Sequence, residues 1–365
     1  MWPYILVILI IFILQFKSNN KEKEKCQFYI GVIILFFFAA FRGVSNGDYT
    51  AYLKLGKEVD SVHKIFNNNT HMEIGYSILY YFINLFHFPE QSIIIAMNLI
   101  SLYFVTKFIN QYSPNKNLSL LLFLPLYFQF DMHAARTAVA ISISTIGITY
   151  VLQRHIFKFC IAIFFATLFH SSAAIVLPIY FFMNININLF IGVITILGSM
   201  CYVYFVGLDK TVLLIFQKLN LQNFYVRYYH YVNDNDFGYR FSLMDPRLLY
   251  CIFIYIISKK VLKKATRIEN FFINCSLANV LIMILFSEHT IFACRLSAFY
   301  NIYSIILVPI ILKKVYISQI RRDGIAAIKS NKEIGLIMAV FFTLYAVSYA
   351  YVCFIALGLE YKLFV

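Results

Sequence analysis

The sequence predicts an all-α fold, a polytopic bundle of transmembrane helices, and three observations support this prediction. Hydrophobic residues fill 61% of the 365 positions and charged residues 13%, whereas soluble domains average about 45–50% and about 25%. The apolar residues run in long stretches, many near the roughly 17–25 residues that a membrane-crossing helix needs. The Lys and Arg residues behind the net charge of +14 gather in short loops between these stretches, which is typical of cytoplasmic loops rather than of nucleic-acid binding.

We expect about 12 spans within a single integral membrane domain at 1–365, because a bilayer core is about 30 Å thick. In chain order, the expected spans lie near residues 2–16, 26–41, 91–109, 118–131, 134–153, 156–169, 171–183, 189–207, 246–259, 270–287, 296–313 and 334–357. The first has no basic start and no small-residue cleavage site, so we expect a retained anchor. The seven cysteines form no CxxC pair, which argues against a disulfide framework or a metal site.

The basic loops set the expected orientation of the spans. The densest lie at 17–25, 258–267 and 313–332, and the positive-inside rule places them in the cytoplasm. The outer, periplasmic face then receives the loop 42–90, the long loop 208–245, and the short turns near Met132, His170 and His289.

One apolar segment, GYSILYYFINLFHF at 75–88, would move every later loop to the other side of the membrane if it crossed. At about 14 residues it fits an interfacial or re-entrant helix better than a span. We therefore place 42–90 wholly outside, with 75–88 in or dipping into the outer leaflet. The alternative is a true crossing that leaves the KEKEK stretch at 21–25 outside.

Many polar side chains gather at the expected outer face, next to apolar stretches. They are Arg42, Asp48, Glu73, Asp131, His133, Arg136, His170, Arg240, Asp245, Arg247, Glu288, His289 and Arg295. A charge at the bilayer centre costs about 2.5–3.5 kcal/mol on insertion scales, so such residues line cavities or form pairs. For Arg136 and Arg295, which begin apolar helices, the alternative is an anchor that snorkels to the interface.

Several arginines around one outward cavity would suit a diphosphate headgroup, since the guanidinium is permanently charged and its planar fork matches phosphate oxygens. The candidates are Arg42, Arg136 and Arg295. Asp48 and Glu73 are candidate proton acceptors, because a carboxylate in a partly dry cavity can have its pKa raised toward the working range. Their alternative role is to neutralise the neighbouring arginines.

Two further features belong to the same face. His170, in the stretch LFHSSAAIVLP, is a candidate for acid–base chemistry, although a lone His at such a turn is more often a hydrogen-bonded structural residue. Gly43 and Gly47 allow the backbone to turn tightly where the apolar run ends, and the NG pair at 46–47 is a strong turn signal.

The loop 208–245 is about 38 residues long, too long for a simple connector. Its first half has helical periodicity and its middle is rich in tyrosine. Tyr228, Tyr229 and Arg240 are therefore candidates for binding a glycan, and the alternative is an interfacial helix held at the headgroup level. The NDNDFG stretch has its Gly and acidic residues at the wrong positions for a calcium loop. No nucleotide-binding or common hydrolase motif is present.

Four stretches resemble the EpsG family of bacterial polysaccharide polymerases: FRGVSNGDYTAYL, EIGYSILYYFI, the run from ARTAVA to LPIYF, and CRLSAFYNIY. The family pattern of Arg-x-Gly, Asp-x-x-x-Tyr, Glu-x-Gly, Arg-x-x-x-Ala and Phe-His-Ser is matched by Arg42, Gly43, Asp48, Tyr52, Glu73, Gly75, Arg136, Ala140, Phe169, His170 and Ser171. The resemblance covers most of 40–185, with weaker support near 294–303.

The resemblance implies a glycosyltransferase-type polymerase, similar in role to the Wzy polymerases of O-antigen and capsule assembly. Its substrate would be an undecaprenyl-diphosphate-linked oligosaccharide at the outer face of the bacterial inner membrane. The growing glycan would move from its lipid diphosphate to the non-reducing sugar of an incoming unit. The sugar–diphosphate bond supplies the driving force, so no cofactor is expected.

Two other functions stay open at this point. An O-antigen ligase uses the same donor with a lipid A-core acceptor, and a flippase or exporter moves polysaccharide without making it. Transporters often show repeated halves with broken helices near the midplane, and the sequence shows no convincing internal repeat. Besides the lipid-linked substrate, the expected partners are membrane lipids and a chain-length regulator protein, and nucleic acid is not among them.

Overall fold

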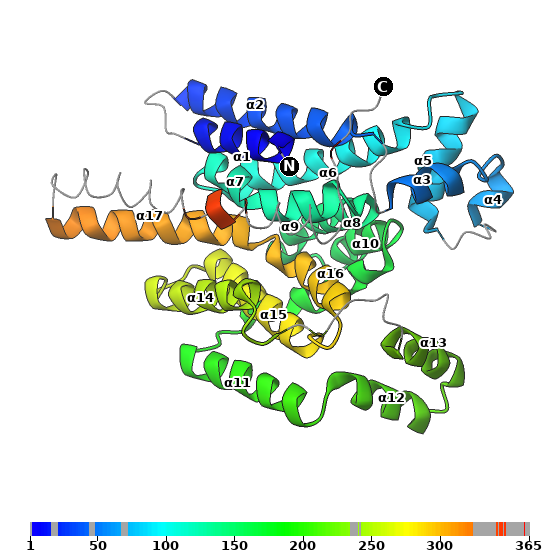
Figure 1. Cartoon of the computed structure of the whole chain (residues 1–365). Coiled ribbons are helices and arrows are strands. Elements are labelled where there is room, and N and C mark those ends of the chain that lie inside the picture. The colour runs from blue at the N-terminus through cyan, green and yellow to red at the C-terminus, as the bar shows by residue number, and fades with distance from the viewer. Residues whose placement is uncertain are drawn as a thin grey trace. The chain divides into compact units, whose positions relative to one another are not determined.

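The computed structural model describes residues 2–15, 21–43, 48–66, 72–233, 240, 242–323, 341, 343–345, 347 and 361. All the elements of secondary structure assigned in these residues are helices (Figure 1), so the all-α prediction is confirmed. The turn expected at Gly47, the basic residues Lys329 and Lys332, and most of the span expected at 334–357 lie outside the described residues. The chain divides into two compact units, 1–177 with 309–365 and 178–308.

The first unit contains the amino-terminal helices and most of the final one. They are α1 (Trp2–Leu14), α2 (Lys21–Ala40), α3 (Tyr49–Gly56), α4 (Val62–Phe66), α5 (Ile74–Leu85), α6 (Ser92–Tyr112), α7 (Lys116–Leu126), a π-helical turn (Tyr127–Asp131), α8 (Ala135–Ser144), α9 (Gly147–Leu152), α10 (Ile156–Thr167), the first part of a 3₁₀ helix (Ser171–Asn184) and α17 (Ser304–Asp323). The central helix is α8, which packs against α6 and α10.

Small side chains explain why α8 can be so deeply buried. Its sequence, ARTAVAISIS, is rich in Ala, Ser and Thr, and such residues let membrane helices approach closely. The serine hydroxyls bond back to the helix itself, Ser142 to the Val139 carbonyl at 2.8 Å and Ser144 to the Ile141 carbonyl at 2.6 Å. The hydroxyls are therefore satisfied without water, as a lipid-embedded bundle requires.

The first expected outer loop folds into three short helices, α3, α4 and α5. The α5 helix has 12 residues, about 18 Å at 1.5 Å per residue, which is well short of a bilayer core of about 30 Å. Its buried face packs on α3, where the Tyr80 hydroxyl bonds the Leu53 carbonyl at 3.3 Å. Whether 75–88 lies in the interface or dips into the leaflet stays a prediction.

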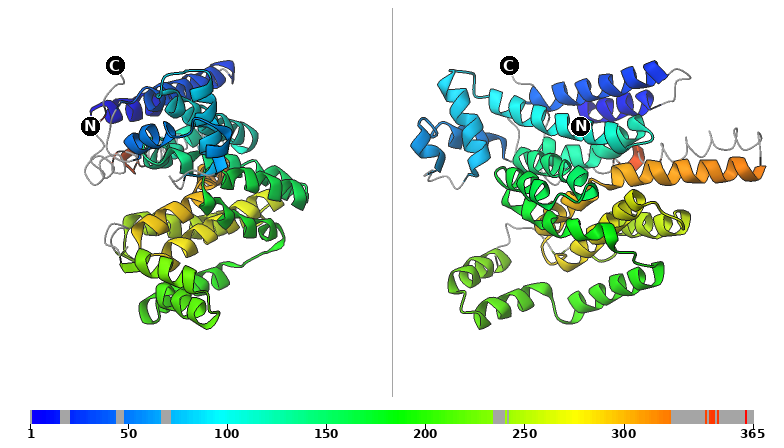
Figure 2. Two further views of the ribbon diagram at one scale, coloured as in Figure 1. Left: turned by 90° about the vertical axis from the view of Figure 1, so that its right-hand side faces the viewer. Right: turned by 180° about the vertical axis from the view of Figure 1, so that it is seen from behind.

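In its described residues, the second unit contains six further α-helices. They are α11 (Leu189–Phe205), α12 (Leu208–Lys218), α13 (Gln222–Asn233), α14 (Pro246–Val261), α15 (Arg267–Leu285) and α16 (Thr290–Asn301). The central one is α15, which packs against α11, α14 and α16. It begins with a capping box in which Thr266 and Glu269 exchange side-chain to backbone bonds. The α12 and α13 helices lie side by side as a hairpin (Figure 2).

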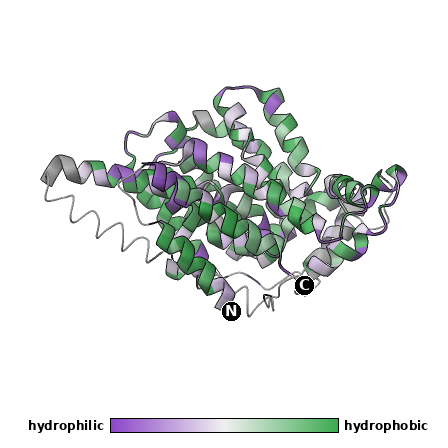
Figure 3. Cartoon of the chain, turned by 90° about the horizontal axis from the view of Figure 1, so that it is seen from above, coloured by the Kyte–Doolittle hydropathy of each residue, from purple (hydrophilic) through white to green (hydrophobic). Residues whose placement is uncertain are grey.

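Apolar residues dominate most of the helices (Figure 3). Within the described residues, three helices are long and apolar enough to cross a membrane: Ser92–Tyr112, Ala135–Leu152 and Arg267–Leu285. Counting each bent pair of helices as one span raises the number to five. Shorter apolar helices cover Trp2–Leu14, Ile74–Leu85, Ile156–Thr167 and Ser171–Phe182. These lengths support an integral membrane bundle, while the expected total of about 12 spans stays a prediction.

Candidate functional site

Arg42 lies just beyond the carboxyl end of α2 and is buried, with 2% of its surface exposed. Its Nη1 donates to the backbone carbonyl of Asp131 at 2.9 Å. Gln91 fixes the chain around it, because its Nε2 donates to the carbonyls of Ala40 at 2.8 Å and Arg42 at 3.0 Å. Nε and Nη2 of Arg42 have no hydrogen-bond partner in the described part of the chain. The buried guanidinium therefore keeps two unused donors.

Four residues from three helical segments meet in the first unit: Asp48, Tyr52, Glu73 and Arg136. We call them the Arg136 cluster. Arg136 Nη1 pairs with Glu73 Oε2, and its guanidinium carbon lies 5.4 Å from the centroid of the Tyr52 ring, a cation–π distance. The Tyr52 hydroxyl donates to Asp48 Oδ2 at 3.1 Å. The cluster thus joins one arginine to two carboxylates through an ion pair and a tyrosine.

Local sequence explains how the cluster forms. Asp48 directly precedes α3, and Tyr52 follows four residues later, so the two side chains share one helix face. Glu73 directly precedes α5 but does not cap it, and its carboxylate reaches Arg136 in the first turn of α8 instead. A cation at a helix amino terminus opposes the helix dipole, and the negative charge of Glu73 offsets that cost.

His170 is connected to the same region through the backbone. The Gly75 N–H donates to the Leu168 carbonyl at 2.7 Å, and a Cβ atom at Gly75 would lie 2.7 Å from that oxygen. Only glycine allows α5 to approach this turn so closely. Two residues further on, His170 Nδ1 accepts from the Ser172 N–H at 3.2 Å. One ring nitrogen of His170 therefore supports the start of the 3₁₀ helix.

Burial sets the protonation of the tyrosine in the Arg136 cluster. Removal from water, and then the negative charge of Asp48, raise the pKa of Tyr52 to about 12. The hydroxyl therefore keeps its proton and acts as a donor to Asp48. The side chains of Arg136 and Glu73 are 19% and 21% exposed, so an external molecule can reach the pair. Arg136 Nε has no hydrogen-bond partner among the described residues.

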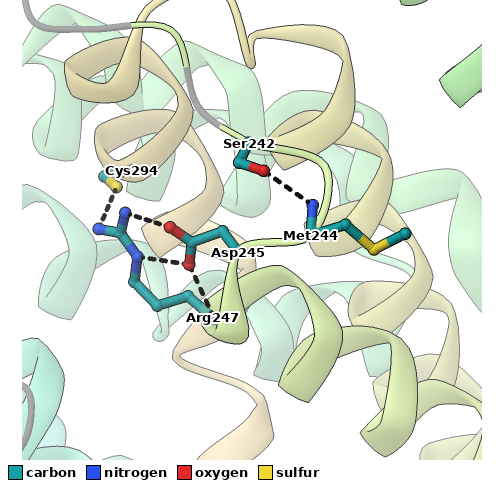
Figure 4. Close-up of polar contacts among 5 residues, drawn as sticks. All are labelled: Ser242, Met244, Asp245, Arg247 and Cys294. Carbon is teal, nitrogen blue, oxygen red and sulfur yellow. Dashed lines mark hydrogen bonds and ion pairs between the residues drawn. The ribbon is translucent and has the colours of Figure 1, made fainter.

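The second unit holds an arginine–carboxylate pair of its own, Asp245 and Arg247 (Figure 4). Arg247 Nε donates to Asp245 Oδ1 at 2.9 Å and Nη2 donates to Oδ2 at 2.8 Å. Burial opposes ionisation, but the bonds from Arg247 outweigh it and lower the pKa of Asp245. Arg247 Nη1 also contacts Cys294 Sγ at 3.7 Å. Because its fork is engaged inside the unit, Arg247 serves to hold α14 against α16.

The remaining candidates for diphosphate or glycan binding lie in the second unit. Arg295 follows Cys294 in α16, is half-buried, and forms no hydrogen bond or ion pair with the described residues. Tyr228 is tied to Asp209, whose Oδ1 accepts from its hydroxyl at 2.6 Å. Tyr229 is 48% exposed, and Arg240 is exposed. These four residues are therefore in a different unit from the Arg136 cluster.

The structure thus brings together Asp48, Glu73 and Arg136, with His170 near by through the backbone. Sequence reasoning did not assign Tyr52 a place in the site, although its spacing of four residues from Asp48 is a usable signal. It also missed Asp209, which has no recognisable motif around it. No group of three or more His, Cys, Asp or Glu side chains in the described ranges is arranged to hold a metal ion.

Comparison with known proteins bears on the whole chain. The model of the EpsG family matches residues 25–357, a range that includes every residue of the Arg136 cluster. No curated protein matches the chain, and no solved structure matches it. The matched range is far more than half of the 365 residues. The chain therefore belongs to the EpsG family, which indicates a membrane protein of polysaccharide biosynthesis.

Proposed function

We propose that the chain polymerises undecaprenyl-diphosphate-linked oligosaccharide repeat units at the outer face of the bacterial inner membrane, making an O-antigen, a capsule or an exopolysaccharide. The observation that carries the proposal is the Arg136 cluster. Three separate sequence motifs, Asp-x-x-x-Tyr, Glu-x-Gly and Arg-x-x-x-Ala, supply its four residues, and the fold brings them into direct contact. A purely structural ion pair would not require residues from all three of these motifs to meet.

In the proposed reaction Arg136 binds the diphosphate of the donor. It lies in the first turn of α8, where the helix dipole also favours an anion. Its side chain is 19% exposed, and its buried Nε has no hydrogen-bond partner among the described residues. Negative charge grows on the diphosphate as the sugar–oxygen bond breaks, and a preorganised cation stabilises that charge. Arg42, in the same unit, is the further arginine that we propose for this anion, and Arg295 of the second unit stays a candidate for diphosphate binding from the sequence alone.

We propose Asp48 as the general base rather than Glu73. Glu73 forms an ion pair with Arg136, whereas the hydrogen bond to Asp48 Oδ2 within the described residues comes from the neutral hydroxyl of Tyr52. The acceptor hydroxyl attacks the anomeric carbon of the donor, its proton passes to the carboxylate, and undecaprenyl diphosphate leaves as an anion. His170 is the reserve candidate, and its Nδ1 accepts from the Ser172 N–H.

Glycan binding is the proposed role of the long loop in the second unit. Tyr228, Tyr229 and Arg240 are the residues that the sequence suggests for it. The hydroxyl of Tyr228 is already bound to Asp209, so the exposed Tyr229 is the better placed of the two tyrosines. A loop that binds the glycan would be expected to differ among proteins that make different polymers.

Deletion of the gene, followed by gel analysis of surface polysaccharide, tests the proposed function. A polymerase defect leaves products that carry a single repeat unit and abolishes the ladder. A ligase defect would instead leave long polymer on undecaprenyl diphosphate. A flippase defect would leave single lipid-linked units on the cytoplasmic side. Either of the last two results would overturn the proposal.

Single-cysteine labelling in a cysteine-free background tests the proposed orientation. A membrane-impermeant thiol reagent should label a cysteine at Asn233 in intact cells, because the loop 208–245 is expected outside. The same reagent should label a cysteine at Lys263 only after the cells are broken open. Labelling of position 233 only in broken cells would place the loop in the cytoplasm and contradict the orientation.

A further inference from the structure

A buried hydrogen-bond network fixes the start of α12 in the second unit. Asp209 Oδ1 accepts from the Tyr228 hydroxyl at 2.6 Å, and Oδ2 bonds His289 Nε2 at 2.8 Å. The Asp209 N–H donates to Glu288 Oε2 at 3.2 Å. We call Asp209, Tyr228, Glu288 and His289 the Asp209 anchor. It links α12 both to α13 and to the turn between α15 and α16.

The backbone at this point is shaped for the anchor. Gly207 has φ of +80°, a conformation that favours glycine, and α11 and α12 meet there at a bend of 73°. A Cβ atom at Gly207 would lie 2.9 Å from Glu288 Oε1, so a larger residue would push the anchor apart. The chain therefore turns sharply into α12 at one defined place.

The anchor also fixes how α13 lies on α12. The rings of Phe216 and Tyr228 meet edge to face with centroids 6.0 Å apart, an arrangement that aromatic pairs prefer. Burial, and then its bond to Asp209, raise the pKa of Tyr228 above its ordinary value, so its hydroxyl stays protonated as a donor. With Tyr228 held on two sides, the rotation of α13 about its axis is determined.

That rotation places two other tyrosines together on α13. Tyr225 and Tyr229 are four residues apart, so they are neighbours on the helix surface. Their rings are nearly parallel, with centroids 6.0 Å apart and an interplanar angle of 14°. Tyr229 is 48% exposed and Tyr225 is partly exposed. The helix thus presents a pair of aligned aromatic rings beside a buried polar anchor.

We propose that Tyr225 and Tyr229 form a platform for a sugar ring of the acceptor repeat unit, and that the Asp209 anchor is its positioning device. Aromatic ring faces carry partial negative charge, and the C–H face of a pyranose packs on such a surface while its hydroxyls bond at the edge. A membrane interface requires only an apolar ring with its hydroxyl in water, whereas a sugar requires ring faces of fixed orientation. The proposal rests on the proposed function and names where its acceptor binds.

Saturation-transfer NMR on the purified full-length protein tests the platform without turnover. The probe is the water-soluble saccharide released by mild acid from lipid-linked repeat units of a strain lacking the gene. Two double variants are compared, Tyr225→Leu/Tyr229→Leu, which keeps apolar bulk, and Tyr225→Phe/Tyr229→Phe, which keeps the rings. Wild type and the Phe variant should bind, and the Leu variant should bind about three- to tenfold more weakly.

Unchanged binding by the Leu variant would overturn the platform, and so would equal losses in the Leu and Phe variants, since the rings would then not be the binding element. The test separates the two proposals. If wild type binds the saccharide but makes no polymer, the proposed function fails. If wild type polymerises and the Leu variant binds normally, only the platform fails.

The positioning role of the anchor is tested by Tyr228→Phe, which removes one hydroxyl and keeps the ring against Phe216. The KM for acceptor units should rise severalfold while kcat is kept, because the platform is displaced and the reacting groups are not. Tyr204→Phe, at an exposed position of α11, is the matched control and should change neither constant. A fall in kcat alone for Tyr228→Phe would contradict a positioning role.

Discussion

The Arg136 cluster and the Asp209 anchor use similar parts in opposite ways. Each combines carboxylates, a tyrosine hydroxyl and a basic side chain. In the Arg136 cluster the charged side chains are about one-fifth exposed and Arg136 keeps an unbonded Nε. In the Asp209 anchor the side chains of Asp209 and His289 are 12% and 11% exposed, and both carboxylate oxygens of Asp209 are bonded.

The difference distinguishes a site that can bind a substrate from a site that stabilises the fold. A buried polar group with all its bonds made gains nothing from a new partner, and removing one of its partners mainly costs stability. A partly exposed arginine can still bind an incoming anion. We therefore expect substitutions in the Arg136 cluster to reduce the rate of polymerisation and those in the Asp209 anchor to reduce stability and acceptor binding.

The largest expected effect is that of Asp48→Asn. If Asp48 takes the proton of the acceptor hydroxyl, the isosteric amide should lower turnover of lipid-linked repeat units by about 10²–10⁴-fold, the range of general-base assistance. Asp60→Asn is the matched control in the same loop, since Asp60 is exposed and pairs with the exposed Lys64 at 2.7 Å. Turnover by Asp48→Asn within about threefold of wild type, far below that range, would refute the assignment.

A smaller but still large effect is expected for Arg136→Lys. Lysine keeps the charge but cannot reproduce the planar fork, so turnover should fall by about 10²–10³-fold, as for loss of one preorganised donor. The protein should still accumulate in the membrane. Arg42→Lys and Arg295→Lys test the other two arginines proposed for the diphosphate, and the burial of Arg42 predicts that its variant also loses stability.

Arg247→Lys is the control for these arginine variants, because its fork is engaged with Asp245. It should lower thermal stability while leaving turnover per folded molecule close to wild type. Near-normal polymer ladders from Arg42→Lys, Arg136→Lys and Arg295→Lys would leave these arginines only the role of interface anchors.

Asp209→Asn should have an intermediate effect of a different kind. The amide cannot accept from both Tyr228 and His289 as the carboxylate does, so the free energy of unfolding should fall by about 1–3 kcal/mol. Thermal unfolding in detergent measures this loss, with Lys210→Gln at the next, exposed position as the control. Loss of kcat without loss of thermal stability would make Asp209 a participant in catalysis. It would contradict the distinction drawn between the Arg136 cluster and the Asp209 anchor.

Sequence patterns predicted some parts of this arrangement and could not predict others. Asp48 and Tyr52 are related by a helical spacing that is visible in the sequence. The contact of Glu73 with Arg136 depends on the packing of α5 near α8, which no local pattern specifies. Asp209 finds its partners 19 and 80 residues away, so only the folded chain reveals the anchor.

The fold shows the same division between local and distant information. Apolar runs predicted the helices well, because segments that are buried in lipid or in protein are rich in apolar residues. They did not predict the π-helical turn Tyr127–Asp131, which forms the end of the expected span 118–131. They also did not predict the 3₁₀ helix Ser171–Asn184. Likewise Arg42 looked like an accessible loop residue and is buried, because Gln91 and Asp131 enclose it.

The smallest expected effect comes from Tyr52→Phe, the counterpart of Tyr228→Phe in the anchor. The substitution removes the hydroxyl that bonds Asp48 and keeps the ring beside Arg136. A single neutral hydrogen bond is worth about 0.5–1.5 kcal/mol net, so turnover should fall only about two- to tenfold. Tyr52→Leu, which also removes the ring, should cost more because it withdraws the cation–π contact from Arg136.

The pH dependence of Tyr52→Phe gives the sharper test. The pKa of Tyr52 is raised to about 12, so its proton is present at every lower pH and is lost only as the pH rises through that value. Wild type and Tyr52→Phe should therefore show activity profiles of the same shape between about pH 6 and pH 9, offset by a constant factor. A change of shape in that range would mean that Tyr52 titrates during the reaction. Tyr52 would then be an acid–base participant, and the proton would have to be followed through it to Asp48.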